Sequence, residues 1–155
     1  MKCPMKRFKT ILFPTDFSRR SAFPLEYVKD IARRNKSKII VLHVIESLEE
    51  MPHVPLPERT IKNLEQERLG LAREKLKEYT QRFLGTFKKV STEVAEGIPY
   101  QVIVDIAKER KADLIIMGTH SREGLVGIFI GHNAKKVIKT APCPVLTVRG
   151  TRGKR

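Results

Sequence analysis

The chain has 155 residues, and its 31 Lys and Arg against 17 Asp and Glu give a formal net charge of +14. This length suits one domain that folds without disulfides or metals, and a hydrophobic content of 41% excludes a disordered chain. No apolar run approaches the roughly 18 residues of a membrane span, so we expect a cytoplasmic protein with no membrane partner.

The domain is expected to fill residues 1–155, with a core of about 8–149 between two basic tails. Such a charge could indicate an anionic partner, such as nucleic acid, a membrane surface or a phosphorylated ligand. Basic residues, however, occur at both ends and along every helical stretch, and no aromatic residues are interleaved with them for base stacking. A solvated basic surface is therefore favoured over nucleic-acid binding. The cysteines, Cys3 and Cys143, are expected to be free thiols.

The first half of the chain predicts two strands around one helix. Thr10–Phe13 is a short apolar strand. The helix after it has Ser18 or Ser21 as its N-cap, and one face carries three apolar residues. Lys38–Val44 follows as a nearly continuous apolar strand, which is typical of parallel strands covered on both faces. The apolar residues of the helix are Leu25, Val28 and Ala32.

An irregular stretch, Glu46–Pro57, precedes the longest predicted helix. Apolar residues step by three and four positions along this helix, with charged residues between them. The next run, Lys88–Ala95, alternates between apolar and polar residues and predicts an edge strand with one wet face. The apolar residues of the helix are Leu69, Ala72, Leu76, Tyr79 and Phe83.

Two further helix and strand pairs complete the chain. A helix begins with Pro99 at its first position and leads to the apolar strand Leu114–Met117. A last helix starts at about Asn133 and ends before Ala141-Pro142, and Val145–Val148 is the last strand. The residues predicted to be buried on these helices are Val102, Ile103, Ile106, Ala107, Ala134, Val137 and Ile138.

Strands that alternate with helices predict an α/β fold, a single doubly wound five-stranded parallel sheet with helices on both faces, as in Rossmann-like proteins. Ligands of such sheets bind beyond the carboxyl ends of the strands, where the strand order reverses. If the order is 3-2-1-4-5, the reversal lies between the first and fourth strands. The loops that follow these strands are Pro14-Thr15-Asp16-Phe17-Ser18 and Gly118-Thr119-His120-Ser121.

The second loop continues through Gly124, Gly127 and Gly131 into the last helix. Glycines allow close approach of a backbone to an anion, and a helix start offers free N–H groups, so this segment is a candidate phosphate site.

Four segments resemble the universal stress protein family. They are Pro14-Thr15-Asp16-Phe17-Ser18, Val41-Leu42-His43-Val44, Ala112–His120 and Ala141–Leu146. The resemblance implies the sheet order 3-2-1-4-5 and a homodimer paired through the last strand, residues Val145, Leu146, Thr147 and Val148. It also implies a small stress-response module that binds ATP or another adenine nucleotide, with or without Mg, and acts as a sensor or regulator and not as an enzyme.

Members of that family that bind ATP share a loop of Gly, two residues, Gly, nine residues, Gly, and then Ser or Thr. This chain keeps the spacing, but Ser121 and His132 replace the second Gly and the final hydroxyl residue. The resemblance implies that Pro14, Asp16 and Val44 surround the adenosine. It places Met117, Gly118, Ser121, Gly131, His132 and Asn133 along the phosphate path.

Simpler interpretations remain for several of these residues. Asp16 could only cap a turn, and His43 fits a core histidine. His120 and His132 have no third partner at metal-binding spacing. Ser121 lacks the surroundings of a nucleophile. The rival functions are a protein-interaction module with a decayed nucleotide site, for an unknown protein partner, and a nucleic-acid-associated basic protein.

Overall fold

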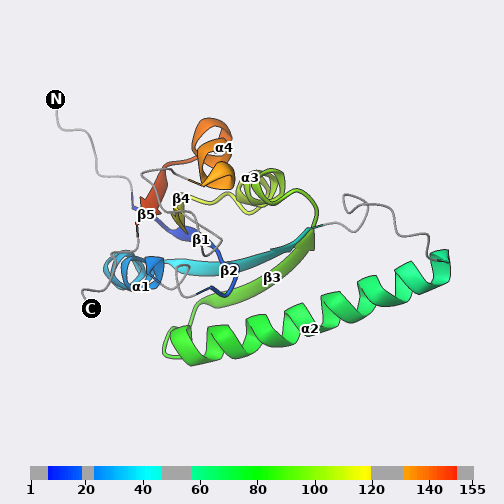
Figure 1. Cartoon of the computed structure of the whole chain (residues 1–155). Coiled ribbons are helices and arrows are strands. Elements are labelled where there is room, and N and C mark those ends of the chain that lie inside the picture. Colours follow the sequence, from blue (N-terminus) through cyan, green and yellow to red (C-terminus); the bar gives the residue numbers. More distant parts are fainter. Residues whose placement is uncertain (1–6, 19–22, 47–56, 120–130, 150–155) are drawn as a thin grey trace, which may run out of the picture.

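The computed structural model describes residues 7–18, 23–46, 57–119 and 131–149. Within these ranges strands and helices alternate along the chain (Figure 1). The strands are β1 (Thr10–Pro14), β2 (Lys38–Ile45), β3 (Val90–Glu96), β4 (Leu114–Gly118) and β5 (Val145–Val148). The helices are α1 (Pro24–Asn35), α2 (Glu58–Leu84), α3 (Pro99–Glu109) and α4 (His132–Thr140).

The strands form one parallel sheet in the order β3-β2-β1-β4-β5, which confirms the predicted fold class and strand order. β1 lies at the centre, where Ile11 is paired with Ile39 of β2 and with Leu114 of β4. Along the chain, β2 and β3 are added on one side of β1, and β4 and β5 are then added on its other side. The strand order therefore reverses between β1 and β4.

Helices cover both faces of the sheet, α1 and α2 one face and α3 and α4 the other (Figure 1). Side chains alternate along a strand, so Ile11 and Phe13 enter the core under α1 and α2, while Leu12 enters the core under α3 and α4. Because both faces are covered, the three buried positions of β1 are all apolar, which explains the apolar run Ile11–Phe13. None of the helices in the described ranges is long and apolar enough to cross a membrane.

β3 is an edge strand with a polar face, as its alternating sequence predicts. On that face Glu93 accepts two hydrogen bonds from Arg110, Nε to Oε2 at 3.1 Å and Nη2 to Oε1 at 3.2 Å. The hydrogen bonds and the negative charge of Glu93 raise the pKa of Arg110 above its ordinary value. The pair connects the end of α3 to β3. Because it is exposed to solvent, it adds little to the free energy of unfolding.

Three details of the helices differ from the sequence predictions. α1 begins at Pro24 after Phe23, without a side-chain cap, so the cap predicted at Ser18 is wrong; Ser21 lies outside the described residues. Pro24 needs no cap at its own amide, because proline has no N–H. On α4, Ile138 was predicted to be buried and is 45% exposed, since it lies one position beyond the buried face of Ala134 and Val137. Val102 of α3 is half-buried.

Gly70 lies in the middle of α2, and a Cβ atom added there would contact nothing within 4 Å. Gly70→Ala should raise the free energy of unfolding by about 0.5–1 kcal/mol, because alanine loses less backbone entropy in a helix. Urea unfolding followed by circular dichroism measures the change. Gly85→Ala is the contrasting variant, since its Cβ would collide with the backbone oxygen of Gln81. Equal changes in the free energy of unfolding for the two variants would contradict this explanation.

Candidate functional site

The candidate site lies beyond the carboxyl ends of β1 and β4, the two strands between which the order reverses. These strands are hydrogen-bonded neighbours, with Leu12 opposite Ile115. The loop after Pro14 and the loop after Gly118 therefore leave the same edge of the sheet side by side. In an open α/β sheet this is the position at which ligands bind.

The loop after β1 is tied to the sheet through Thr15. Its N–H donates to the carbonyl of Leu42 at 2.8 Å, and its buried side-chain oxygen accepts the N–H of Phe17 at 3.1 Å. Asp16 is exposed, and its Oδ1 accepts the N–H of Ser18 at 3.0 Å, a turn in which the side chain replaces a backbone carbonyl. The turn leaves Asp16 exposed to solvent just beyond the end of β1.

His43 of β2 contacts this loop on the face of the sheet that α1 and α2 cover. Its Nδ1 lies 2.8 Å from the carbonyl oxygen of Thr15, and a carbonyl can only accept, so Nδ1 carries the proton. The ring also stacks on Phe17 with 4.3 Å between centroids. Phe17 has φ of 64°, a left-handed conformation that few bulky residues adopt. His43 was predicted to be a core histidine; it is half-buried and positions the loop that carries Asp16.

The buried residue Thr119 links the end of β4 to the start of α4 through a backbone hydrogen bond. The N–H of Thr119 donates to the carbonyl of Val148 at 3.2 Å, and its own carbonyl accepts the N–H of Gly131 at 2.6 Å. Gly118 and Gly131 are thus close in space although many residues separate them in the sequence. His120 and Ser121 lie outside the described residues.

The start of α4 has no side-chain cap. Gly131 occupies the cap position, His132 is the first helical residue and is exposed, and Asn133 is half-buried within the first turn. The first N–H groups of a helix have no partner inside the helix, and together they form the positive end of its dipole. This helix start can therefore bind an anion such as a phosphate group.

Three apolar side chains line the same face of the sheet, the face under α3 and α4. Val44 and Met117 belong to the core on that face, and Pro14 shares it because it lies two positions after Leu12. Met117 is buried, and Val44 and Pro14 are half-buried at the ends of their strands. They offer an apolar surface on the side of the sheet where α4 begins, which suits a flat ring whose polar groups point outward.

Among the described residues, no three His, Cys, Asp or Glu side chains lie close enough to hold a metal ion. The described parts of the crevice are an apolar wall, one exposed carboxylate and an uncapped helix start. Sequence reasoning named each of these residues, but it missed the role of His43 in holding the loop. The signal for it was a polar ring inside an otherwise apolar strand.

An open doubly wound parallel sheet, whose strand order reverses between β1 and β4, places the chain among the Rossmann-like α/β proteins. The model of the Universal stress protein family matches residues 7–149, and the chain belongs to this family.

The relatives agree with this assignment over nearly the whole chain. A universal stress protein of Methanocaldococcus jannaschii is 36% identical over 146 residues, covering 92% of this chain and 82% of the relative. A second one from the same archaeon is 30% identical over 154 residues, covering 92% of this chain and 95% of the relative. The solved structure of that second protein gives a TM-score of 0.80, covering 96% of this chain and all of the other.

More distant structures share the fold alone. The universal stress protein of Archaeoglobus fulgidus in complex with dAMP has a TM-score of 0.62 and 21% identity, and covers 92% of this chain and 98% of the other.

Proposed function

We propose that this protein binds an adenine nucleotide, ATP or AMP, in the crevice beyond β1 and β4, and that it acts as a dimeric stress-response sensor or regulator. The proposed role is binding and not turnover. One observation carries the proposal: the apolar wall of Pro14, Val44 and Met117 lies on the side of the sheet where the uncapped start of α4 stands. An adenine ring and a phosphate chain need these two surfaces next to each other.

The individual residues fit this ligand. The carboxylate of Asp16 can accept hydrogen bonds from the ribose or the base, and the backbone around Gly131 can approach a phosphate closely. Mg²⁺ would enter on the phosphates of ATP, since this ion keeps several waters and needs few protein ligands. Structures of the same fold in complex with dAMP and with cAMP support an adenine nucleotide as the ligand class.

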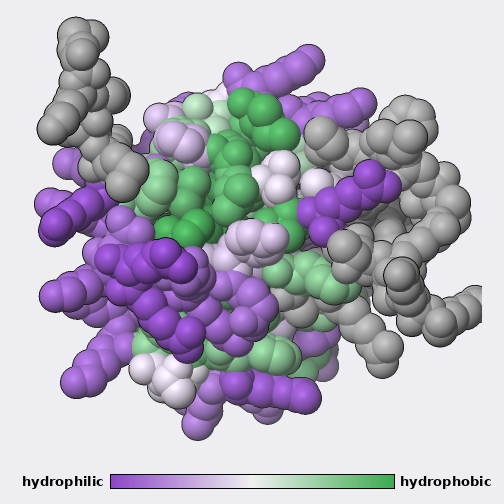
Figure 2. All heavy atoms as spheres, turned by 90° about the vertical axis from the view of Figure 1, so that its left-hand side faces the viewer, coloured by the Kyte–Doolittle hydropathy of each residue, from purple (hydrophilic) through white to green (hydrophobic). Residues whose placement is uncertain are grey.

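Pairing through β5 is the proposed route to a homodimer. β5 is the last strand of the sheet order, and its residues Val145, Leu146 and Thr147 are half-buried. Figure 2 views the molecule from the side on which β5 lies, and apolar surface gathers on that face between hydrophilic regions. An apolar strand at a sheet edge favours pairing with another strand, and here a second copy of the chain would supply it.

His132 favours a second candidate function, a protein-interaction module without nucleotide. This side chain is exposed at the start of α4, the position at which ATP-binding members of the family place a hydroxyl residue. Neutral histidine caps a helix and bonds a phosphate less well than a hydroxyl does.

Calorimetric titration with ATP, ADP and AMP, with and without Mg²⁺, tests the proposal. We expect binding by the wild type and a loss of roughly tenfold in affinity for Asp16→Asn, because the charged acceptor disappears. The Asn side chain still accepts the N–H of Ser18, so the turn persists. Asp105→Asn removes the same charge on the exposed side of α3 and should leave affinity unchanged. Wild-type protein that gives no heat and no thermal shift with any of the three nucleotides would favour the interaction module.

A further inference from the structure

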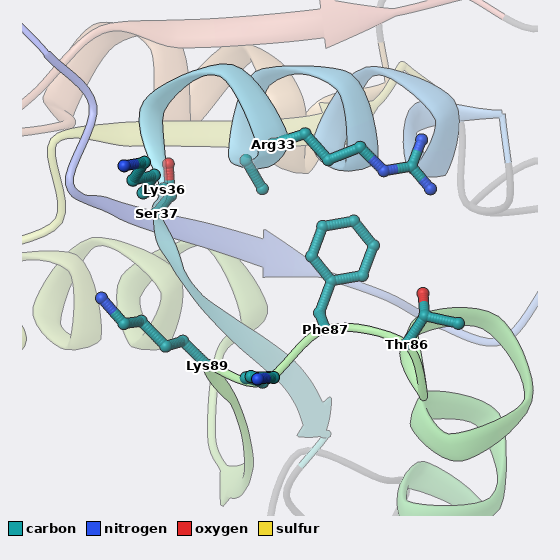
Figure 3. A pocket seen from close by; sticks show the side chains of 8 residues that line it. Arg33, Lys36, Ser37, Thr86, Phe87 and Lys89 are labelled. Atoms are coloured by element: carbon teal, nitrogen blue, oxygen red, sulfur yellow. The ribbon is translucent and has the colours of Figure 1, made fainter.

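A cavity of about 530 Å³ lies at the end of the sheet opposite the crevice (Figure 3). It is bounded by the last turn of α1, the residues that precede β2 and the connection from α2 to β3. Its size falls within the range of small-molecule sites. The lining residues are Ala32, Arg33, Lys36, Ser37, Thr86, Phe87, Lys88 and Lys89.

Positive charge is concentrated at this cavity. Four of its eight lining residues are basic and none is acidic, whereas 31 of the 155 residues of the chain are basic. The four are exposed, and none of them forms an ion pair within the described ranges. Neighbours on α1 behave differently, since Lys29 pairs with Glu26 and Arg34 with Asp30, both at 2.9 Å. Arg33, the one cation of α1 without an ion pair in the described ranges, is therefore the one that lines the cavity.

An aromatic ring holds one of these cations in place. The guanidinium of Arg33 lies 5.3 Å from the centre of the Phe87 ring, and Figure 3 shows that ring directed toward Arg33. Stacking on a ring occupies a face of the guanidinium and leaves the N–H groups at its rim free to donate. The planar arrangement of these N–H donors matches the oxygens of a phosphate group. Ser37 is buried and already donates to the carbonyl of Phe8, so it contributes no donor.

The end of α1 explains only part of this cluster. Cations near the carboxyl end of a helix are stabilised by its dipole, which accounts for Arg33 and Lys36. Lys88 and Lys89 come from a different element, and the fold brings them to the same cavity. Like charges gathered around one cavity repel one another unless an anion lies between them. The arrangement is therefore more favourable with a bound anion than without one.

We propose that this cavity is a second binding site, distinct from the crevice, for a small oligophosphate. Several phosphate groups in one ligand match four cations, and the limited size of the cavity favours a small molecule over a polymer. The phosphate backbone of a nucleic acid shares this chemistry, so the test includes both.

The test is titration of ¹⁵N-labelled full-length protein with inorganic tripolyphosphate at low ionic strength, followed by amide chemical shifts. Shifts should concentrate at residues 32–37 and 86–89. Lys88→Gln/Lys89→Gln should weaken binding roughly three- to thirtyfold, since two exposed charge interactions disappear. Lys77→Gln/Lys108→Gln removes the same charge elsewhere and should change affinity less than about twofold. Added salt should weaken binding of the wild type.

Three outcomes would overturn the proposal. Shifts confined to residues 14–18 and 131–135 would place the ligand in the crevice. Equal losses in the two double variants would show that only net charge matters. Tighter binding of a short single-stranded oligonucleotide at the same amides would assign the surface to nucleic acid.

Discussion

Thr147→Pro should convert the proposed dimer into a monomer. In β5 the carbonyls of Pro144 and Val148 accept N–H groups of Ile115 and Thr119, at 3.0 and 3.2 Å. Bonding residues alternate along a parallel strand, so the N–H of Thr147 points away from β4, toward the outer edge. Proline there removes a donor needed for pairing with a second copy, while the bonds to β4 remain. The dimer dissociation constant should rise about tenfold or more.

Sedimentation velocity at micromolar concentration measures this change. Thr147→Val is the matched control, because it keeps the outward N–H and should remain dimeric. Leu146→Lys is a weaker test, since Leu146 packs against the core under α1 and α2 and a charge there would also disturb folding. Circular dichroism must show that Thr147→Pro is folded. A wild type that sediments as a monomer would remove the basis for the dimer.

Leu76→Ala should lower the free energy of unfolding by about 2–5 kcal/mol. Leu76 has no exposed surface and fixes α2 to the sheet, together with Ala72 and Leu84. The shortened side chain leaves a cavity that a close-packed core fills only in part. A loss of this size is a large share of the roughly 5–15 kcal/mol that stabilises a typical domain.

The same helix supplies the control. Leu71 is 60% exposed, so Leu71→Ala removes the same atoms without opening a cavity and should cost under about 0.5 kcal/mol. Urea unfolding followed by circular dichroism compares the two variants, which suits a chain without Trp. Similar losses in both would mean that α2 is not held to the sheet through Leu76.

The elements were predictable because their signals are local. Continuous apolar runs marked the buried strands, the alternation in residues 88–95 marked the edge strand, and Pro99 marked the start of α3, where the structure places it. The sheet order came from the resemblance to universal stress proteins. The error at Ile138 has a simple cause. Ile138 follows the buried Val137 in the sequence and is equally apolar, but on a helix its side chain points about 100° away from that of Val137.

Contacts between distant residues were not predictable from the sequence. The bond between His43 and Thr15 depends on the register of β1 and β2, and no local pattern encodes that register. The cavity near Arg33 and Lys89 unites residues far apart in the chain. In the sequence these cations resemble an ordinary solvated surface, and only the fold shows that they gather around one cavity.

The uneven packing of α2 gives this helix two parts of different local stability. All three of its buried residues lie in the segment 72–84, while its first turns extend past the sheet (Figure 1). Between these two parts, Arg68 Nη2 donates to the carbonyl of Glu46 at 3.1 Å. Helical segments that bury few side chains are marginally stable in water. The first part can therefore open and close many times while the rest of the domain stays folded, so its amides should exchange with solvent at a much lower free-energy cost than those of the second part. We therefore expect this domain to combine a sheet that is covered on both faces with a helical arm whose first turns open locally.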